Sequence, residues 1–279
     1  MPRAGGEAAK LGDHYEAIWT VDSLLDSLSG EAVLVQPEPF DEEEAEGIEF
    51  IKVLDNGETE YHSVKRQKVG ESWSLNNLTA TSTKGRSILG DLFSKLARNE
   101  KARSVFVSQT GANELLELCD RARRCKAISD WIKQLESATH LREGFETRVL
   151  PLCNKDREVA FDRLKRMRVV AFDEREMTKR VEQKTRFLLR RQDGGAIDAG
   201  EVRRLLGEFI TMRLGEVIQK NDVLTHLSEH GFSPRPWASD KALLERVAQL
   251  NETYLIPIRS QFVNKKPIPR METKVAVSK

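Results

Sequence analysis

The stretch EGIEFIKVLDNGETEYHSVKRQ, residues 46–67, decides the fold of this chain. Asn56-Gly57 stands between two apolar runs, and this pair favours a hairpin because both central positions of a tight turn need a positive φ. The pattern therefore predicts two neighbouring strands joined by a turn at residues 55–57. Carboxylates lie on the first strand, and Lys65-Arg66 ends the second.

Alternation of side chains assigns a face to each strand residue. On the first strand we expect Ile48, Phe50 and Val53 to point toward a core and Glu49 to point toward the opposite face. On the second strand Lys65 shares a face with Ser63 and Tyr61, while His62 takes the other face. Carboxylates and a lysine on adjacent strands are the minimum needed to hold a divalent metal beside a phosphodiester.

The chemistry predicted for this centre follows from those residue types. Glu46 and Glu49 supply hard oxygen ligands, which Mg²⁺ prefers together with waters and phosphates. Such an ion would polarise a phosphate and lower the pKa of a bound water, and Lys65 would position that water or stabilise the developing charge. Glu16, in a helix expected from Gly12 onward, is a possible further ligand. A carboxylate in a first helical turn is also favoured by the helix dipole, so that alternative stays open.

Composition excludes several classes of protein. The 279 residues carry a net charge of only +1, so no global field favours nucleic acid or a membrane, and any basic surface must be local. Three cysteines without a C-x-x-C pair argue against a disulfide framework and for a reducing compartment. No run of 18 apolar residues and no apolar signal core occur. We therefore expect a cytoplasmic protein without a membrane partner.

The order of elements predicts an α/β domain over residues 1–126, with a mixed sheet flanked by helices. Its predicted elements are a helix, three strands, a helix, a strand and a helix. Residues 127–256 are expected to be mostly α-helical, as a linker or oligomerisation domain. Residues 257–279 contain three prolines and are expected to be a lead-in to a further region beyond Lys279. No P-loop motif occurs in residues 1–279, so any nucleotide hydrolysis would belong to that further region.

Two other clusters have simpler interpretations. The basic cluster 121–126 fits a solvated helix end better than a DNA-facing patch. His226 and His230 stand four residues apart like a metal pair, but no third ligand or HExxH glutamate accompanies them, so we interpret them as surface histidines.

The run from Gly12 to about Ala122 resembles the PD-(D/E)xK endonuclease domains at the N-termini of bacterial antiphage STAND/NACHT-type NTPases (AVAST-like) and related CBASS nuclease effectors. The resemblance lies in five blocks, in order: residues 12–16 (GDHYE), 46–50 (EGIEF), 61–67 (YHSVKRQ), 72–75 (SWSL) and 105–115 (VFVSQTGANEL). It implies a restriction-endonuclease-like core and cleavage of double-stranded DNA dependent on Mg²⁺ or Mn²⁺. It also implies activation by self-association into an oligomer through an NTPase or sensor domain of the same polypeptide.

The resemblance also implies roles for single residues. Glu46 or Glu49 matches the metal-binding acid, Lys65 the motif lysine, and Glu16 the acid of the first helix. The polar residues that follow the lysine are expected to contact DNA: Arg66, Gln67 and Lys68.

Two positions depart from the family pattern. Ser63 stands where these nucleases usually have Glu or Gln, and Glu46 replaces the more usual Asp. Ser63 is expected to take the catalytic position of that Glu or Gln, but a hydroxyl is a weaker metal donor than a carboxylate, so the metal would depend more on the three glutamates. The alternatives are a catalytically inactive nuclease-like fold that acts as a DNA-binding or protein-interaction module, and a structural adaptor built on the helical half.

Overall fold

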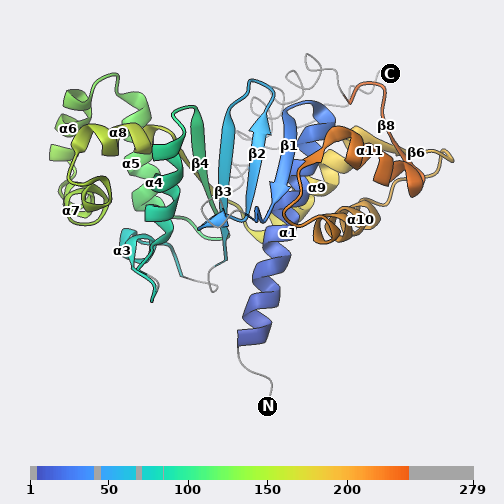
Figure 1. Cartoon of the computed structure of the whole chain (residues 1–279), viewed down its shortest axis with the longest axis horizontal. Coiled ribbons are helices and arrows are strands. Elements are labelled where there is room, and N and C mark those ends of the chain that lie inside the picture. The colour runs from blue at the N-terminus through green and yellow to red at the C-terminus, as the bar shows by residue number, and fades with distance from the viewer. Residues whose placement is uncertain (1–4, 41–44, 67–70, 84, 239–279) are drawn as a thin grey trace, which may run out of the picture. The chain divides into compact units, whose positions relative to one another are not determined.

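The computed structural model describes residues 5–40, 45–66, 71–83 and 85–238, with side chains from His14 onward (Figure 1). Gln67, Lys68 and the predicted lead-in 257–279 lie outside the described residues. Within them no helix is long and apolar enough to cross a membrane.

A six-stranded mixed sheet forms the centre of the fold, in the order β5-β4-β3-β2-β1-β7. The first three strands pair antiparallel, and β4 and β5 continue the sheet parallel to β3. The prediction of a mixed sheet flanked by helices is thereby confirmed. The strands span β1 (Ala32–Pro37), β2 (Phe50–Leu54), β3 (Thr59–Lys65), β4 (Ala102–Ser108), β5 (Met167–Ala171) and β7 (Ile218–Gln219), and a separate pair spans β6 (Leu189–Arg191) and β8 (Phe232–Pro234).

The predicted hairpin is present. β2 pairs with β3 from Phe50 opposite His62 to Val53 opposite Thr59. Gly57 has φ of +80°, and the Asn56 side-chain oxygen accepts a hydrogen bond of 2.9 Å from the Glu58 N–H. Asn56 is not among the described non-glycine residues with positive φ, so the expectation of a positive φ at both central positions is confirmed for Gly57 and wrong for Asn56.

Helices cover both faces of this sheet (Figure 1). One group packs beside β3, β4 and β5, and a second group, begun by the long N-terminal helix, packs beside β1. The first group consists of α3 (Leu75–Thr79), α4 (Ile88–Arg98), α5 (Asn113–Arg124), α6 (Ile128–Glu136), α7 (Thr139–Gly144), a π-turn at Phe145–Val149, a 3₁₀-turn at Leu150–Cys153 and α8 (Arg157–Lys165). The second group consists of α1 (Gly5–Ser29), α9 (Glu174–Leu188), α10 (Ala199–Met212) and α11 (Lys220–Glu229).

Because both faces are covered, one expectation about the first strand is wrong. Ile48 belongs to the core beside α4, together with Ile51 and Tyr61. Phe50 is buried on the other face, where its ring stacks on His62 at 4.3 Å between centroids. The prediction of a single core face for Ile48 and Phe50 assumed a sheet with one solvated side.

The segment after residue 126 is mostly helical but also supplies two strands of the sheet, β5 and β7. Residues 154–172 fall in the segment expected to be mostly α-helical, yet α8 ends at Lys165 and Met167–Ala171 pairs with β4. Short apolar runs such as MRVVA suit a buried strand and a helix equally by pattern. Strands of one sheet therefore lie on both sides of the boundary expected at residue 126, and a separate role for 127–256 stays a prediction.

A buried network of charges joins α1, α9 and the hairpin. Lys184 of α9 contacts Asp22 at 3.2 Å and also pairs with Asp26, and the two aspartates are 4% and 5% exposed. From the other side Lys52 of β2 approaches Asp26 at 3.1 Å and Glu60 of β3 at 3.3 Å. The ammonium groups of α9 and β2 therefore lie between carboxylates of α1 and β3.

The same network fixes the protonation of His62. The Trp19 indole N–H donates to Nδ1 of His62 at 3.1 Å, so the ring proton lies on Nε2, 3.1 Å from a Glu60 oxygen. Burial, the largest influence, lowers the pKa of His62. A neutral ring between an indole donor and a carboxylate acceptor satisfies both nitrogens.

We expect Lys184→Met to lower the free energy of unfolding by about 3 kcal/mol, because it removes one of the two cations that each of the two buried aspartates contacts. Lys179→Met, on an exposed position of the same helix, should change it by no more than about 0.5 kcal/mol. Urea unfolding measures both. Equal effects of the two substitutions would contradict a stabilising role for the network.

Stability should also fall in acid. Neighbouring cations, together with the His62 hydrogen bond to Glu60, lower the pKa of Asp26 and Glu60 to about 2 despite burial. Carboxyls with a lowered pKa stabilise the fold above their unfolded pKa, near 4, and this stabilisation is lost as the pH falls toward 2. Stability should also fall below about pH 6.5 because of His62, whose lowered pKa means that the unfolded chain binds the proton more readily than the folded chain. Urea midpoints between pH 7 and pH 2 should follow this course, and Glu60→Gln should have a shallower acid slope.

Candidate active site

The hairpin register brings Glu49 and Lys65 together. Glu49 immediately precedes β2, and its backbone N–H donates to the His62 carbonyl at 2.9 Å. One carboxylate oxygen of Glu49 pairs with the Lys65 ammonium, and the other accepts the Val64 N–H at 2.5 Å. The structure therefore places this acid and this lysine in direct contact, whereas their catalytic roles stay predictions.

The pair lies at the border between core and solvent. The Glu49 side chain is 13% exposed and the Lys65 side chain 28%. Burial raises the pKa of Glu49, and the Lys65 charge and the Val64 N–H oppose that rise. A carboxylate that is costly to desolvate binds a second cation readily, because added positive charge stabilises its ionised form.

A second carboxylate, Asp91, approaches from α4. A Cβ at Gly47 would lie 2.7 Å from an Asp91 carboxylate oxygen, so the side chain packs directly against the segment between Glu46 and Glu49. Burial raises the pKa of Asp91, and the charges of Arg86, Lys95 and Lys65 oppose that rise. Asp91 is therefore within electrostatic range of Lys65.

Asp91 is the residue that sequence reasoning missed. Ser87 caps α4 by accepting the Gly90 N–H at 3.2 Å, and Asp91 then falls in the first turn, where an acid has an ordinary explanation in the helix dipole. The available signal is the spacing of Asp91 and Lys95, four residues apart, which places both on one side of the helix. Lys95 is 2% exposed, so that side faces the interior.

Glu46 and Ser63 have other surroundings. Glu46 pairs with Arg86, both partly exposed, and so contacts a different cation from Glu49. Ser63 is fully buried, and its hydroxyl has no hydrogen-bond partner among the described residues. The hydroxyl lies on the same face of β3 as Lys65, by alternation. The site roles predicted for Glu46 and Ser63 stay predictions.

Glu16 belongs to a helix on the other side of the strand. Three residues after Glu16, Trp19 of α1 donates to His62, which points away from the Ser63 face of β3. To share a ligand with Glu49, the Glu16 side chain would have to reach around the end of β3. Its role as a metal ligand stays a prediction.

Arg66 contacts protein groups in this structure. Its guanidinium approaches Glu174 of α9 at 3.3 Å and donates to the Gln109 side-chain oxygen at 3.2 Å. A DNA contact by Arg66 would have to replace or share these partners.

Among the described residues no three His, Cys, Asp or Glu side chains lie close enough together to hold a metal ion. Mg²⁺ nevertheless needs only one or two carboxylates, because waters and substrate phosphates complete its shell. Glu49 pairs with Lys65, and Asp91 packs against Gly47, two residues before Glu49. These two partly buried carboxylates fit that requirement.

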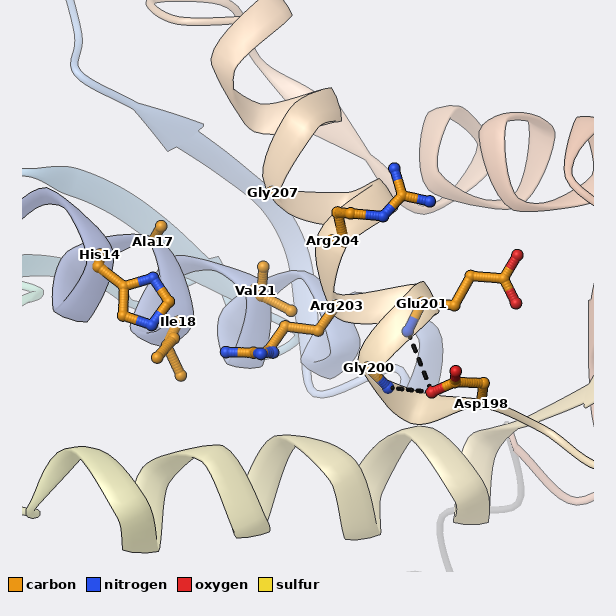
Figure 2. Close-up of a pocket in the computed structure, with 10 residues that line it drawn as sticks. All are labelled: His14, Ala17, Ile18, Val21, Asp198, Gly200, Glu201, Arg203, Arg204 and Gly207. Carbon is orange, nitrogen blue, oxygen red and sulfur yellow. Dashed lines mark hydrogen bonds between the residues drawn. The ribbon is translucent and has the colours of Figure 1, made fainter.

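A cavity of about 750 Å³ lies between α1 and α10 (Figure 2). Its floor is apolar, with Ile18 and Val21, and Figure 2 shows the Arg203 guanidinium extending toward the helix that carries His14. The acids at its edge have other partners: Asp198 accepts the Gly200 N–H at 2.8 Å, and Glu201 approaches Arg191 at 3.4 Å. The cavity therefore lacks a carboxylate–lysine pair.

Comparisons with known proteins add a loose structural likeness. No family model matches the chain, and no curated protein matches it in sequence. The Acinetobacter baumannii Cap4 SAVED/CARF-domain containing receptor with the cyclic trinucleotide 2'3'3'-cAAA overlays 78% of this chain and 46% of its own, at TM-score 0.43 and 12% identity. The Moraxella osloensis Cap4 SAVED/CARF-domain containing receptor gives TM-score 0.42 and 11% identity, over 79% and 47%. The chain thus spans about half the length of these receptors, and a likeness at this level does not bear on function.

Two glycine substitutions test the approach of Asp91. Gly47 and Gly57 both have positive φ, at +73° and +80°, but a Cβ at Gly57 would meet nothing within 4 Å. Gly57→Ala should cost about 1 kcal/mol of stability for backbone strain alone. Gly47→Ala should cost about 1–3 kcal/mol more, because it also displaces Asp91. Equal costs in chemical denaturation would show that Asp91 does not pack there.

Proposed function

We propose that this chain is a divalent-metal-dependent DNA endonuclease domain whose centre is Lys65, Glu49 and Asp91. The observation that carries the proposal is the Glu49–Lys65 contact at the end of the hairpin, with Asp91 approaching from α4. Two acids and a lysine near the ends of two inner strands are the residue types that phosphodiester hydrolysis needs.

The order of elements supports the same proposal. α1, the antiparallel strands β1 to β3, α4 and then β4 parallel to β3 follow the order expected for a restriction-endonuclease-like core. Lys65 ends β3 and Glu49 immediately precedes β2, the two neighbouring strands to which the resemblance assigned the motif lysine and the acid. The substrate implied is double-stranded DNA.

Glu49 and Asp91 would hold Mg²⁺ or Mn²⁺ through their carboxylate oxygens. When bound, the metal would polarise the scissile phosphate and lower the pKa of a water. Lys65 would then exchange its pairing with Glu49 for a hydrogen bond from Nζ to the attacking water or to a phosphate oxygen, where negative charge builds up. The resemblance also implies Glu46 and Glu16 as metal ligands, but here Glu46 pairs with Arg86 and Glu16 belongs to the helix on the other side of β3.

Asp91 would also compensate for the departure from the family pattern at Ser63. The family pattern has a carboxylate or amide two residues before the lysine, and here that position holds a buried hydroxyl. An acid from α4 on the same side of the sheet would restore the missing oxygen ligand. A site with a serine in the motif thus keeps two carboxylates near Lys65.

The setting proposed is antiphage defence, with cleavage switched on when an attached NTPase or sensor domain gathers the chains into an oligomer. This part rests on the sequence resemblance alone.

Cleavage tests the proposal directly. Supercoiled plasmid should be nicked or linearised in Mg²⁺ or Mn²⁺ by the chain, either alone or clustered through a fused oligomeric coiled coil. Lys65→Ala, Glu49→Gln and Asp91→Asn should each lower the rate by at least about 100-fold, because each removes a group that contacts the metal or the developing charge. Lys179→Ala, an exposed lysine of α9, should leave the rate unchanged. Failure of both forms to cut DNA with either metal would contradict the assignment.

An inactive nuclease-like fold is the second candidate, and the observation that favours it is Ser63. Under that alternative the chain binds duplex DNA, the binding weakens steeply with salt, and no strand is cut. Cleavage that disappears in Asp91→Asn would exclude this alternative.

A further inference from the structure

A second charged site lies at the opposite end of the parallel strands. A cleft of about 610 Å³ opens where β4 and β5 begin, beside the end of α8. Six cationic and three acidic side chains line it, a net charge of +3 in a chain whose total is +1. The cations are Lys101, Arg103, Arg123, Lys165, Arg166 and Arg168.

Two arginines are fixed in the wall of this cleft by backbone carbonyls. Arg166 donates to the Leu96 carbonyl at 2.9 Å and to the Asn99 carbonyl at 3.0 Å. Arg123 donates to the carbonyl of Met167, at the start of β5. These bonds hold both guanidinium groups in place without a ligand, so the wall is preorganised.

Three cations from three different elements have no carboxylate partner among the described residues. Lys101 precedes β4, Lys165 ends α8 and Arg168 is in β5. Lys101 is more than 60 residues away in sequence from the other two. The Lys165 ammonium lies 5.1 Å from the centre of the Phe161 ring. Because the fold brings these like charges together, they repel one another, and a bound anion would reduce that repulsion.

The acids of the cleft do not cancel this charge. Glu58 pairs with Arg103 at 2.9 Å, Asp162 pairs with Arg166, and Arg123 also pairs with Asp120 just outside, which leaves a surplus of two positive charges. By contrast, three other cavities, including the one in Figure 2, are each lined by two acids and two arginines and have no surplus. Among these four cavities of the described residues, the positive surplus is found in this cleft alone.

We propose that this cleft binds a small molecule that carries two or more phosphate groups. Its volume lies in the range of small-molecule sites, roughly 300–1,000 Å³. Its cations converge in one concavity, whereas a duplex backbone requires them along a stripe. Guanidinium and ammonium groups are the standard partners of phosphate oxygens.

The cleft is separate from the Glu49–Lys65 pair. β3 and β4 pair from Thr59 opposite Ala102 at the cleft to Lys65 opposite Ser108 at the other end. At about 3.3 Å per residue the two sites are roughly 20 Å apart. The proposal therefore does not depend on the proposed nuclease function.

Isothermal titration calorimetry with inorganic tripolyphosphate tests it, in EDTA so that neither a metal nor DNA cleavage contributes. The wild-type chain should bind, and binding should weaken as salt is added. The double variant Lys101→Gln/Arg168→Gln should weaken binding by at least about tenfold, because it removes two charge-assisted contacts. Both side chains are exposed, so the fold should persist, which circular dichroism checks.

The matched control is Lys133→Gln/Lys179→Gln, which removes the same charge from exposed positions outside the cleft. It should change the dissociation constant by less than about twofold. Absence of wild-type binding, equal weakening by the two double variants, or displacement of tripolyphosphate by duplex DNA would each overturn the proposal.

Discussion

The buried pairing of Asp22 and Asp26 with Lys184 and Lys52 is the constraint on which the rest of the structure depends. Taking these charges out of water is costly, and only good geometry with several partners offsets that cost. The desolvation free energy is offset only when α1, α9 and the hairpin are all in place, because each contributes charged groups that pair with those of the others. The network therefore ties residues beyond 170 to the first three strands more specifically than apolar packing would.

The two faces of β3 serve different purposes. Glu60 and His62 point into this network, and Ser63 and Lys65 point to the side where α4 packs. Since a shift of one residue would exchange the faces, the network also sets the register that brings Lys65 to Glu49. A buried structural requirement on one face thus fixes the position of the candidate catalytic lysine on the other.

Charge is distributed unevenly around a nearly neutral chain. Near the C-terminal end of β3 the acids Glu46, Glu49 and Asp91 stand among cationic side chains, whereas cations outnumber acids where β4 and β5 begin. A net charge of +1 could not reveal this difference, because it sums over the whole chain. The length of β3 and β4 separates the two places, so an anionic ligand in the cleft and a metal ion at Glu49 would not compete.

The sequence by itself determined the hairpin, the mixed sheet with helices on its faces, and the meeting of Glu49 with Lys65. These follow from turn chemistry and a period of two, which act between residues close in sequence. Only the tertiary structure decided that β5 and β7 join the sheet, that Phe50 faces the network, and that Asp91 approaches Lys65. Each of these depends on contacts between distant residues, and a short apolar run or an acid in a first helical turn looks the same in sequence whichever partner the fold provides.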